Sequence, residues 1–354
     1  MSKLHIANTF VEWELETDPE IALEKAFHLH PVYLQLQFLP LLYANADDCL
    51  LVTDLPAEET LNIPEIAPPQ LSLLSGKIDC SHGEIEAWGP SRLIAKWAQD
   101  HHCRYHLPDW SVAKKVNSKQ FSFENSPRLP HAALLFGRDE ARAWLRSFPG
   151  KKVLKTCYGV SGRGHLHLEG EGMLMGRALS YLEKEWEKCR PVIAEPWVER
   201  VLDFSTQWFI ETNGSMQFLG ATVCANEPKG TYLSNRAGDP KKLFGPHLGF
   251  VEEHTAIAKS CAEYMARLGF FGNIGFDAML YTHAGNVHLH PIVEINARKT
   301  MGWAALQFRQ RHFPHATVQF SYHQCRKGAL PSSLKMANGR TVAFPRNLTI
   351  DICN

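Results

Sequence analysis

Residues 293–302 read VEINARKTMG, and this stretch places three different polar groups at the end of an apolar strand. Glu294, Asn296 and Arg298 alternate with apolar residues. In an extended segment, residues two apart share a face, so the carboxylate, the amide and the guanidinium are expected to converge. Oxygen ligands suit a hard cation, and a guanidinium suits an anion. The stretch therefore predicts one site that receives both.

A second carboxylate is expected beside the first. Asp277, in GNIGFDAML, lies on the first strand of a predicted hairpin whose return strand carries Glu294 and Asn296. Two carboxylates and an amide on neighbouring strands would bind Mg²⁺ and leave positions open for phosphates. The alternative is that Asp277 caps a turn while Glu294 pairs with Arg298 across a solvated edge.

A glycine loop lies earlier in the chain. KKVLKTCYGVSGRGHLHL (151–168) reads as a strand, a loop and a second strand. Gly159, Gly162 and Gly164 allow close approach of a ligand and can present N–H groups to an anion, and Lys155 can supply charge to a phosphate. The loop is neither a Walker loop nor a Rossmann fingerprint, and three glycines also fit a tight hairpin.

The composition limits the classes of partner. The 354-residue chain has 37 Lys plus Arg and 37 Asp plus Glu, so net charge recruits neither nucleic acid nor a membrane surface. The start MSKLHIANTF lacks an apolar signal core, and no apolar run approaches a membrane span, which predicts a cytoplasmic protein. Nine scattered cysteines argue against a disulfide-stapled domain, and most are expected to be buried.

The chain is expected to form an α/β protein of three domains, over residues 1–115, 116–190 and 191–354. The first is a small α/β unit, the second is a central unit around the glycine loop, and the third contains hairpins and one long helix. The predicted elements are a helix capped by Ser91, a turn-rich stretch over 116–135, a helix over 139–148, a hairpin turning at Asn213-Gly214, a helix over 252–269 and a hairpin turning at Gly285-Asn286.

Taken in order, these patterns resemble the ATP-grasp superfamily over about residues 115–305. The resemblance rests on the lysine in NSKQF, the lysine in VLKT with its glycine loop, the linker VIAEPWVERVLDFS, the aspartate in GFDAML, and EINAR. The most specific element is Glu-x-Asn-x-Arg preceded by an acidic strand residue. The resemblance implies an N-terminal Rossmann-like domain, a small central lid domain and a C-terminal domain whose antiparallel sheet carries the metal site.

The resemblance also implies a role for each matching residue. Lys119 and Lys155 would contact the nucleotide phosphates, and the loop with Gly159, Ser161, Gly162 and Gly164 would cover them. Glu195, Trp197 and Val198 would contact the adenine, and Asp203 the ribose. Asp277, Glu294 and Asn296 would bind Mg²⁺, or Mn²⁺ in its place, and Arg298 would contact the transferred phosphate. Arg236 and Lys229 compete for a further basic position. Pro196 stands where the family commonly has a charged residue, and no glycine-rich run follows Asn296.

The activity implied by the resemblance is ADP-forming ligation of a small-molecule carboxylate to an amine, such as an amino acid or a peptide-like substrate. Two alternatives stay open. An ATP-grasp phosphotransferase would form ADP without releasing phosphate, and a regulatory protein would bind nucleotide without turnover.

Overall fold

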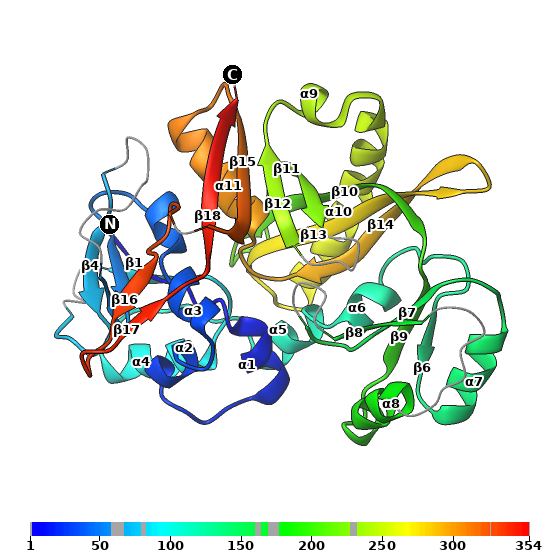
Figure 1. The fold of residues 1–354 in the computed structure, drawn as a ribbon, viewed down its shortest axis with the longest axis horizontal. Coiled ribbons are helices and arrows are strands. Elements are labelled where there is room, and N and C mark those ends of the chain that lie inside the picture. The colour runs from blue at the N-terminus through cyan, green and yellow to red at the C-terminus, as the bar shows by residue number, and fades with distance from the viewer. Residues whose placement is uncertain are drawn as a thin grey trace.

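A computed structural model describes residues 2–57, 67–78, 83–159, 164–168, 177–226, 232–325 and 327–353. The described strands form four sheets. Figure 1 shows an N-terminal unit, a small lid unit and a large sheet between and above them. The fold is mixed α/β, as the sequence predicts.

The N-terminal unit is built on a parallel sheet with the strand order β4-β2-β1-β5. Its strands are β1 (Lys3–Ile6), β2 (Cys49–Val52), β4 (Gln70–Leu73) and β5 (Glu84–Ala87), and its helices are α1 (Val11–Thr17), α2 (Leu23–Phe27), α3 (Pro31–Leu36), the 3₁₀ helix η1 (Leu39–Leu42) and α4 (Arg92–Asp100). Ser91 caps helix α4, because its side chain accepts a hydrogen bond from the Ile94 amide, so the predicted N-cap is confirmed.

The lid unit is a four-stranded sheet with the order β6-β9-β7-β8. Its elements are β6 (Ala133–Leu135), α7 (Arg138–Arg146), β7 (Lys152–Lys155), β8 (His165–Leu168), α8 (Arg177–Glu187) and β9 (Val192–Pro196). Helices α5 (Trp110–Val116) and α6 (Lys119–Glu124) lead into it. The sequence predicted only turns at α6. Ser118 instead starts a helix there, because its side chain accepts a hydrogen bond from the Phe121 amide.

The large sheet is antiparallel and has the order β14-β13-β10-β11-β12-β15-β18. Its strands are β10 (Glu199–Ile210), β11 (Met216–Asn226), β12 (Tyr232–Ala237), β13 (Gly272–His283), β14 (Asn286–Asn296), β15 (Thr317–Gln324) and β18 (Arg346–Cys353). The first predicted hairpin turns at Asn213-Gly214. The second turns one residue earlier than predicted, at Ala284-Gly285, where both residues have positive φ.

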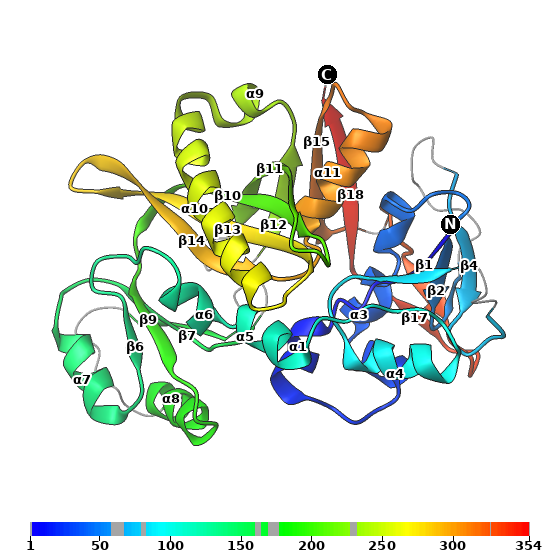
Figure 2. The same ribbon diagram turned by 180° about the vertical axis from the view of Figure 1, so that it is seen from behind.

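Two helices cover opposite faces of this sheet. The 20-residue helix α10 (Leu248–Arg267) follows α9 (Pro240–Phe244) and the 3₁₀ helix η2 (Gly245–His247), and Figure 2 shows it across the sheet. Val223 packs in a core cluster with Val251 of α10, whereas its neighbour Thr222 lies close to Gly302 of α11 (Met301–His312). Since adjacent strand residues face opposite ways, α11 lies on the other face.

The C-terminal segment returns to the N-terminal unit. Strands β16 (Ser333–Lys335) and β17 (Thr341–Ala343) form a small sheet with β3 (Leu55–Pro56), and β18 is an edge strand of the large sheet. One core cluster joins the N-terminal unit to α11, and within it Tyr43 packs edge-on against Trp303 with ring centroids 4.7 Å apart. The N-terminal unit is therefore packed directly against the segment that follows EINAR.

The cysteines differ in part from expectation. Of the seven free cysteines in the described ranges, Cys157 and Cys261 are buried and the others are half-buried or exposed, so the expectation that most cysteines are buried is wrong. Cys103 is disulfide-bonded.

Among the helices of the described ranges, none combines the length and apolar character that would let it cross a bilayer.

Candidate active site

The acidic strand residues lie side by side on the large sheet. The antiparallel register of β13 and β14 places Asp277 opposite Glu294 and Gly275 opposite Asn296. Directly opposed residues share a face, so the two carboxylates point the same way. Burial, and then the charge of Glu294, raise the pKa of Asp277 to about 6. Two close acids with little solvent favour the arrival of a cation.

Asn296 and Arg298 extend this row. The Asn296 side chain donates through Nδ2 to Asp277 Oδ2 at 2.9 Å, and its Oδ1 accepts from Arg298 Nη2 at 2.9 Å. Arg298 also donates through Nη1 to the Lys299 carbonyl at 2.9 Å and forms an ion pair with Glu12 of α1. Asp277, Asn296 and Arg298 thus form one hydrogen-bonded network, and an ion pair extends it to Glu12 of the N-terminal unit.

Lys119 reaches the acidic pair from the start of α6. Its Nζ donates to Glu294 Oε1 at 2.7 Å and to the Gly159 carbonyl at 2.9 Å. The Lys119 side chain is only 6% exposed. Because the backbone amide of Lys119 also donates to the Cys157 carbonyl, the helix start is fixed to the chain that leaves β7. A lysine predicted for phosphate and a carboxylate predicted for metal are therefore in direct contact.

Lys155 and Glu195 form a second ion pair on the lid sheet. Strands β7 and β9 are antiparallel neighbours, and Lys155 Nζ lies 2.5 Å from Glu195 Oε2. Leu154 and Ala194 point the other way, into the core beneath α7 and α8. Burial disfavours the charged carboxyl, but the nearby ammonium outweighs burial and the pKa of Glu195 is lowered. Both charges consequently face the large sheet.

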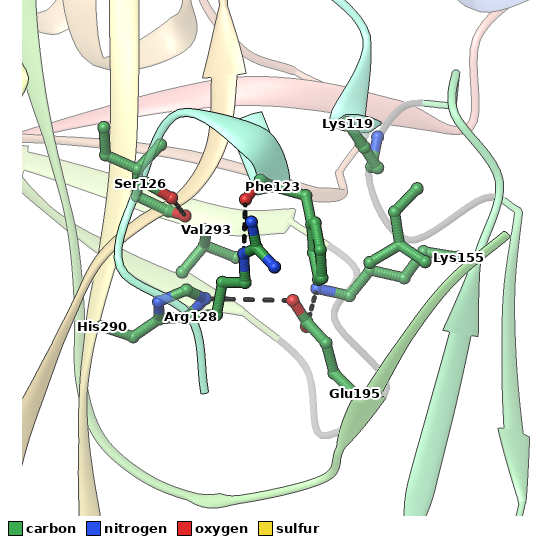
Figure 3. A pocket seen from close by; sticks show the side chains of 10 residues that line it. Lys119, Phe123, Ser126, Arg128, Lys155, Glu195, His290 and Val293 are labelled. Carbon is green, nitrogen blue, oxygen red and sulfur yellow. Dashed lines mark hydrogen bonds and ion pairs between the residues drawn. The ribbon is translucent and has the colours of Figure 1, made fainter. Parts of the chain in front are cut away.

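His290 lies beside the Lys155–Glu195 pair, and the sequence pattern did not predict it as a site residue. Figure 3 shows its ring directed at Glu195, with Nε2 4.0 Å from Glu195 Oε1. Burial lowers the pKa of His290 to about 4, so the ring is neutral near pH 7. His290 lies opposite Met279, which is two residues from Asp277 on β13, so His290 shares the face of Glu294. The register of β13 and β14 is irregular between these two pairs, so alternation along β14 alone could not have predicted it.

Two cavities adjoin these groups. A small one, of about 10 Å³, is lined by Lys119, Lys155, Glu195 and His290 together with Phe123, Ser126, Arg128, Ile193, Ile292 and Val293 (Figure 3). A larger one, of about 610 Å³, is lined by Lys151, Trp197, Val198, Glu199, Arg200, Val201, Leu202, Asp203, Cys224, Ala225 and Asn226. The larger volume is typical of a small-molecule site.

The larger cavity contains three residues expected to contact the nucleoside. Asp203 accepts hydrogen bonds from Arg200 Nη1 and Asn226 Nδ2, both at 3.0 Å. The Trp197 ring lies edge-on to His167, with centroids 4.5 Å apart, and 5.0 Å from the guanidinium carbon of Arg200. The predicted residues therefore divide into a charged group at the small cavity and an aromatic and polar group at the larger one.

Arg236 is not brought to this site. It pairs in register with Val223, whose side chain packs on the α10 face of the sheet, and it is exposed. Its neighbour Asn235 faces the other way and donates to Cys224 Sγ at 3.0 Å. A strand residue alternates faces with its neighbours, so Arg236 points away from Asp277 and Glu294.

The glycine loop is described only at its ends. The Gly159 carbonyl accepts from Lys119, and Gly164 has a φ of 82° that favours glycine. A Cβ at Gly164 would lie 2.5 Å from Thr156 Oγ1, so this position also lacks space for a side chain. Ser161, Gly162 and Lys229 lie outside the described residues.

Comparison with known proteins gives matches by structure alone. No protein-family model and no curated protein sequence matches the chain. An ADP complex of N5-carboxyaminoimidazole ribonucleotide synthetase matches with a TM-score of 0.50 and 13% identity, over 90% of each chain.

Biotin carboxylases give shorter matches. Biotin carboxylase from Campylobacter jejuni has a TM-score of 0.49 and 15% identity, over 71% of this chain and 61% of that one. The biotin carboxylase domain of Hydrogenobacter thermophilus 2-oxoglutarate carboxylase has a TM-score of 0.47 and 16% identity, over 65% and 55%. The chain thus spans less than two thirds of the length of these carboxylases.

The synthetase match covers 90% of this chain, and the synthetase is an ATP-grasp protein. The parallel N-terminal sheet and the antiparallel sheets agree with that architecture. The chain therefore has the ATP-grasp fold.

Proposed function

We propose that the protein is an ATP- and Mg²⁺-dependent ligase that joins a small-molecule carboxylate to an amine and releases ADP and phosphate. The observation that carries the proposal is the meeting of Asp277 and Glu294 with Lys119 where the lid unit adjoins the large sheet. The synthetase of the same fold holds ADP, which supports nucleotide binding here.

The residues at the acidic pair fit Mg²⁺. Asp277, Glu294 and Asn296 would hold the ion, and Asn296 Oδ1 keeps a lone pair beyond the one that accepts from Arg298. Among the described residues, no group of three or more His, Cys, Asp or Glu is arranged as a metal site. Mg²⁺ can take its remaining ligands from water and phosphates, and when bound it would neutralise phosphate charge.

The remaining residues would bind and orient the nucleotide. The adenosine would occupy the larger cavity against Trp197 and Val198, with its ribose near Asp203. Its phosphates would extend toward the charged group, where Lys119 and Lys155 can donate to phosphate oxygens. Arg298, fixed from three sides, would offset charge on the transferred group without reorganising.

The reaction then requires positioning more than a covalent nucleophile. A carboxylate oxygen attacks the terminal phosphorus and releases ADP, which leaves an acyl phosphate. The amine attacks the acyl carbon, phosphate departs, and the amine proton is lost to solvent. Holding both substrates in line and keeping water from the acyl phosphate are the contributions expected of this chain.

The test is release of ADP and free phosphate from MgATP, with pooled amino acids and small carboxylates. Glu294→Gln is compared with wild type and with Glu211→Gln, which changes an exposed glutamate just beyond the end of β10. Phosphate that appears with ADP only when both pools are present, and only with an intact Glu294, supports the ligase. ADP without phosphate would indicate a phosphotransferase, and unchanged turnover in Glu294→Gln would contradict the metal assignment.

A further inference from the structure

The ammonium group of Lys119 contacts the Glu294 carboxylate, which is a candidate metal ligand. Its Nζ lies 2.7 Å from Glu294 Oε1 and 2.9 Å from the Gly159 carbonyl oxygen. With the side chain 6% exposed, water contributes little to balancing this charge, and the Glu294 carboxylate is the anion that does so. A buried lysine that loses such a partner is left with a desolvated charge.

Glu294 therefore has two competing partners. It lies opposite Asp277, on the face where a divalent cation would be held. A cation there would approach the same carboxylate that Lys119 contacts, and the two positive charges would repel each other at short distance. Metal alone must then either displace Lys119 or bind against its charge, and both cost affinity.

We infer that Lys119 and the divalent cation exclude each other at Glu294, and that nucleotide phosphate relieves the conflict by receiving the displaced lysine. The inference rests on the proposed nucleotide function and adds a coupling to it. Metal and nucleotide then bind cooperatively. The nucleotide phosphate accepts the displaced Lys119, so the metal can bind Glu294 without opposing the lysine charge, and a bound metal leaves Lys119 available to the phosphate. Such a coupling is reciprocal, so the factor is the same whichever ligand binds first.

The other lysine of the site provides the contrast. Lys155 is buried to a similar degree and pairs with Glu195 at 2.5 Å, but Glu195 lies on the lid sheet, away from the acidic pair of β13 and β14. Removing the charge of Lys155 changes the electrostatic potential around the site, but it does not free any of the proposed metal ligands from an ion pair. Lys155→Met is therefore a charge-matched control for Lys119→Met.

The experiment measures binding of Mn²⁺ alone by the loss of its free-ion electron paramagnetic resonance signal, in the absence and presence of ADP. In wild type, ADP is expected to strengthen Mn²⁺ binding on the order of tenfold or more. In Lys119→Met, Mn²⁺ alone is expected to bind several-fold more tightly than in wild type, while the strengthening by ADP shrinks by a similar factor. Lys155→Met is expected to change Mn²⁺ affinity far less.

Lys119→Gln serves as a second variant if the methionine protein does not fold, because its amide can still donate to the Gly159 carbonyl. An Mn²⁺ affinity that is unchanged or weaker in both folded variants would overturn the inference. Equal gains in Lys119→Met and Lys155→Met would also overturn it, since general electrostatics would then suffice. If wild type binds ADP, but neither ADP nor substitution of Lys119 changes the Mn²⁺ affinity, the proposed coupling is wrong and the nucleotide function stands. If wild type binds neither ligand, both fail.

Discussion

Arg298 and Glu12 form an ion pair that joins the end of β14 to the first helix of the chain. Their side chains are 11% and 13% exposed, so both charges depend largely on each other. The next residue repeats the arrangement, because Lys299 Nζ lies 2.6 Å from Glu86 Oε1 of β5. Two consecutive basic residues after EINA are thus held by two acids of the N-terminal unit, which fixes the direction of the Arg298 guanidinium.

Glu12→Gln and Arg298→Gln are each expected to lower the free energy of unfolding by about 2–4 kcal/mol, because each leaves a largely buried charge unpaired. The double variant should lose about 1–3 kcal/mol less than the sum of the single losses. Urea denaturation of all four proteins measures this coupling. Arg92→Gln, which removes an exposed pair with Asp18, should cost less than about 1 kcal/mol. Additive losses at Glu12 and Arg298 would show that the pair is not a structural unit.

Lys155→Met is expected to impair both stability and nucleotide binding, and a second change separates the two. Alone, it strands the Glu195 carboxylate, at a cost of about 3 kcal/mol or more. Adding Glu195→Gln removes the stranded charge and should restore much of the stability. Affinity for ADP, measured by calorimetry, should stay weakened about tenfold or more in both proteins, since a charge-assisted bond to phosphate is lost. Recovery of ADP affinity in the double variant would remove Lys155 from the nucleotide site.

Gly302→Ala is expected to destabilise the protein by about 1–3 kcal/mol. An added Cβ would lie 2.7 Å from Thr222 Oγ1 and 3.2 Å from Gln207 Nε2, and both of those side chains are fully buried. Gly249→Ala, near the start of α10, meets nothing within 4 Å and should be neutral or gain up to about 1 kcal/mol. Thermal melts of the two variants compare the sites. Equal effects would contradict close packing of α11 on the sheet.

Stability is expected to fall as the pH drops from 6.5 toward 4, in part through His254. Its Nδ1 donates to the Pro291 carbonyl and its Nε2 accepts from Thr206, and burial lowers its pKa to about 4. Below pH 6.5 the unfolded chain binds a proton that the folded chain does not, so folding loses up to roughly 3 kcal/mol by pH 4 and nothing above pH 6.5. In His254→Gln this part of the pH dependence should vanish from urea unfolding curves recorded at pH 7, 5.5 and 4.5. A wild-type slope in the variant would assign the effect to other groups.

Local pattern was enough for much of the fold and part of the site. Ser91 marked a helix start and Asn213-Gly214 a hairpin turn, because caps and tight turns depend on neighbouring residues. The alternation in EINAR likewise predicts that Glu294 and Asn296 share a face, because alternation along a strand depends only on adjacent residues. The prediction is wrong at α6, where Ser118 caps a helix in a stretch predicted to be rich in turns, and at the second hairpin, where the turn lies one residue earlier.

The sequence by itself determined which groups could act, namely two carboxylates, an amide, a guanidinium and two lysines in an order that resembles the ATP-grasp superfamily. Only the tertiary structure decided which of them meet. It brought Lys119 to Glu294, Arg298 to Glu12 and His290 to Glu195, and it turned Arg236 to the opposite face. Such contacts depend on how separate sheets and helices pack, and on the strand register that sets each side chain's face. Neither is encoded within a short stretch of chain.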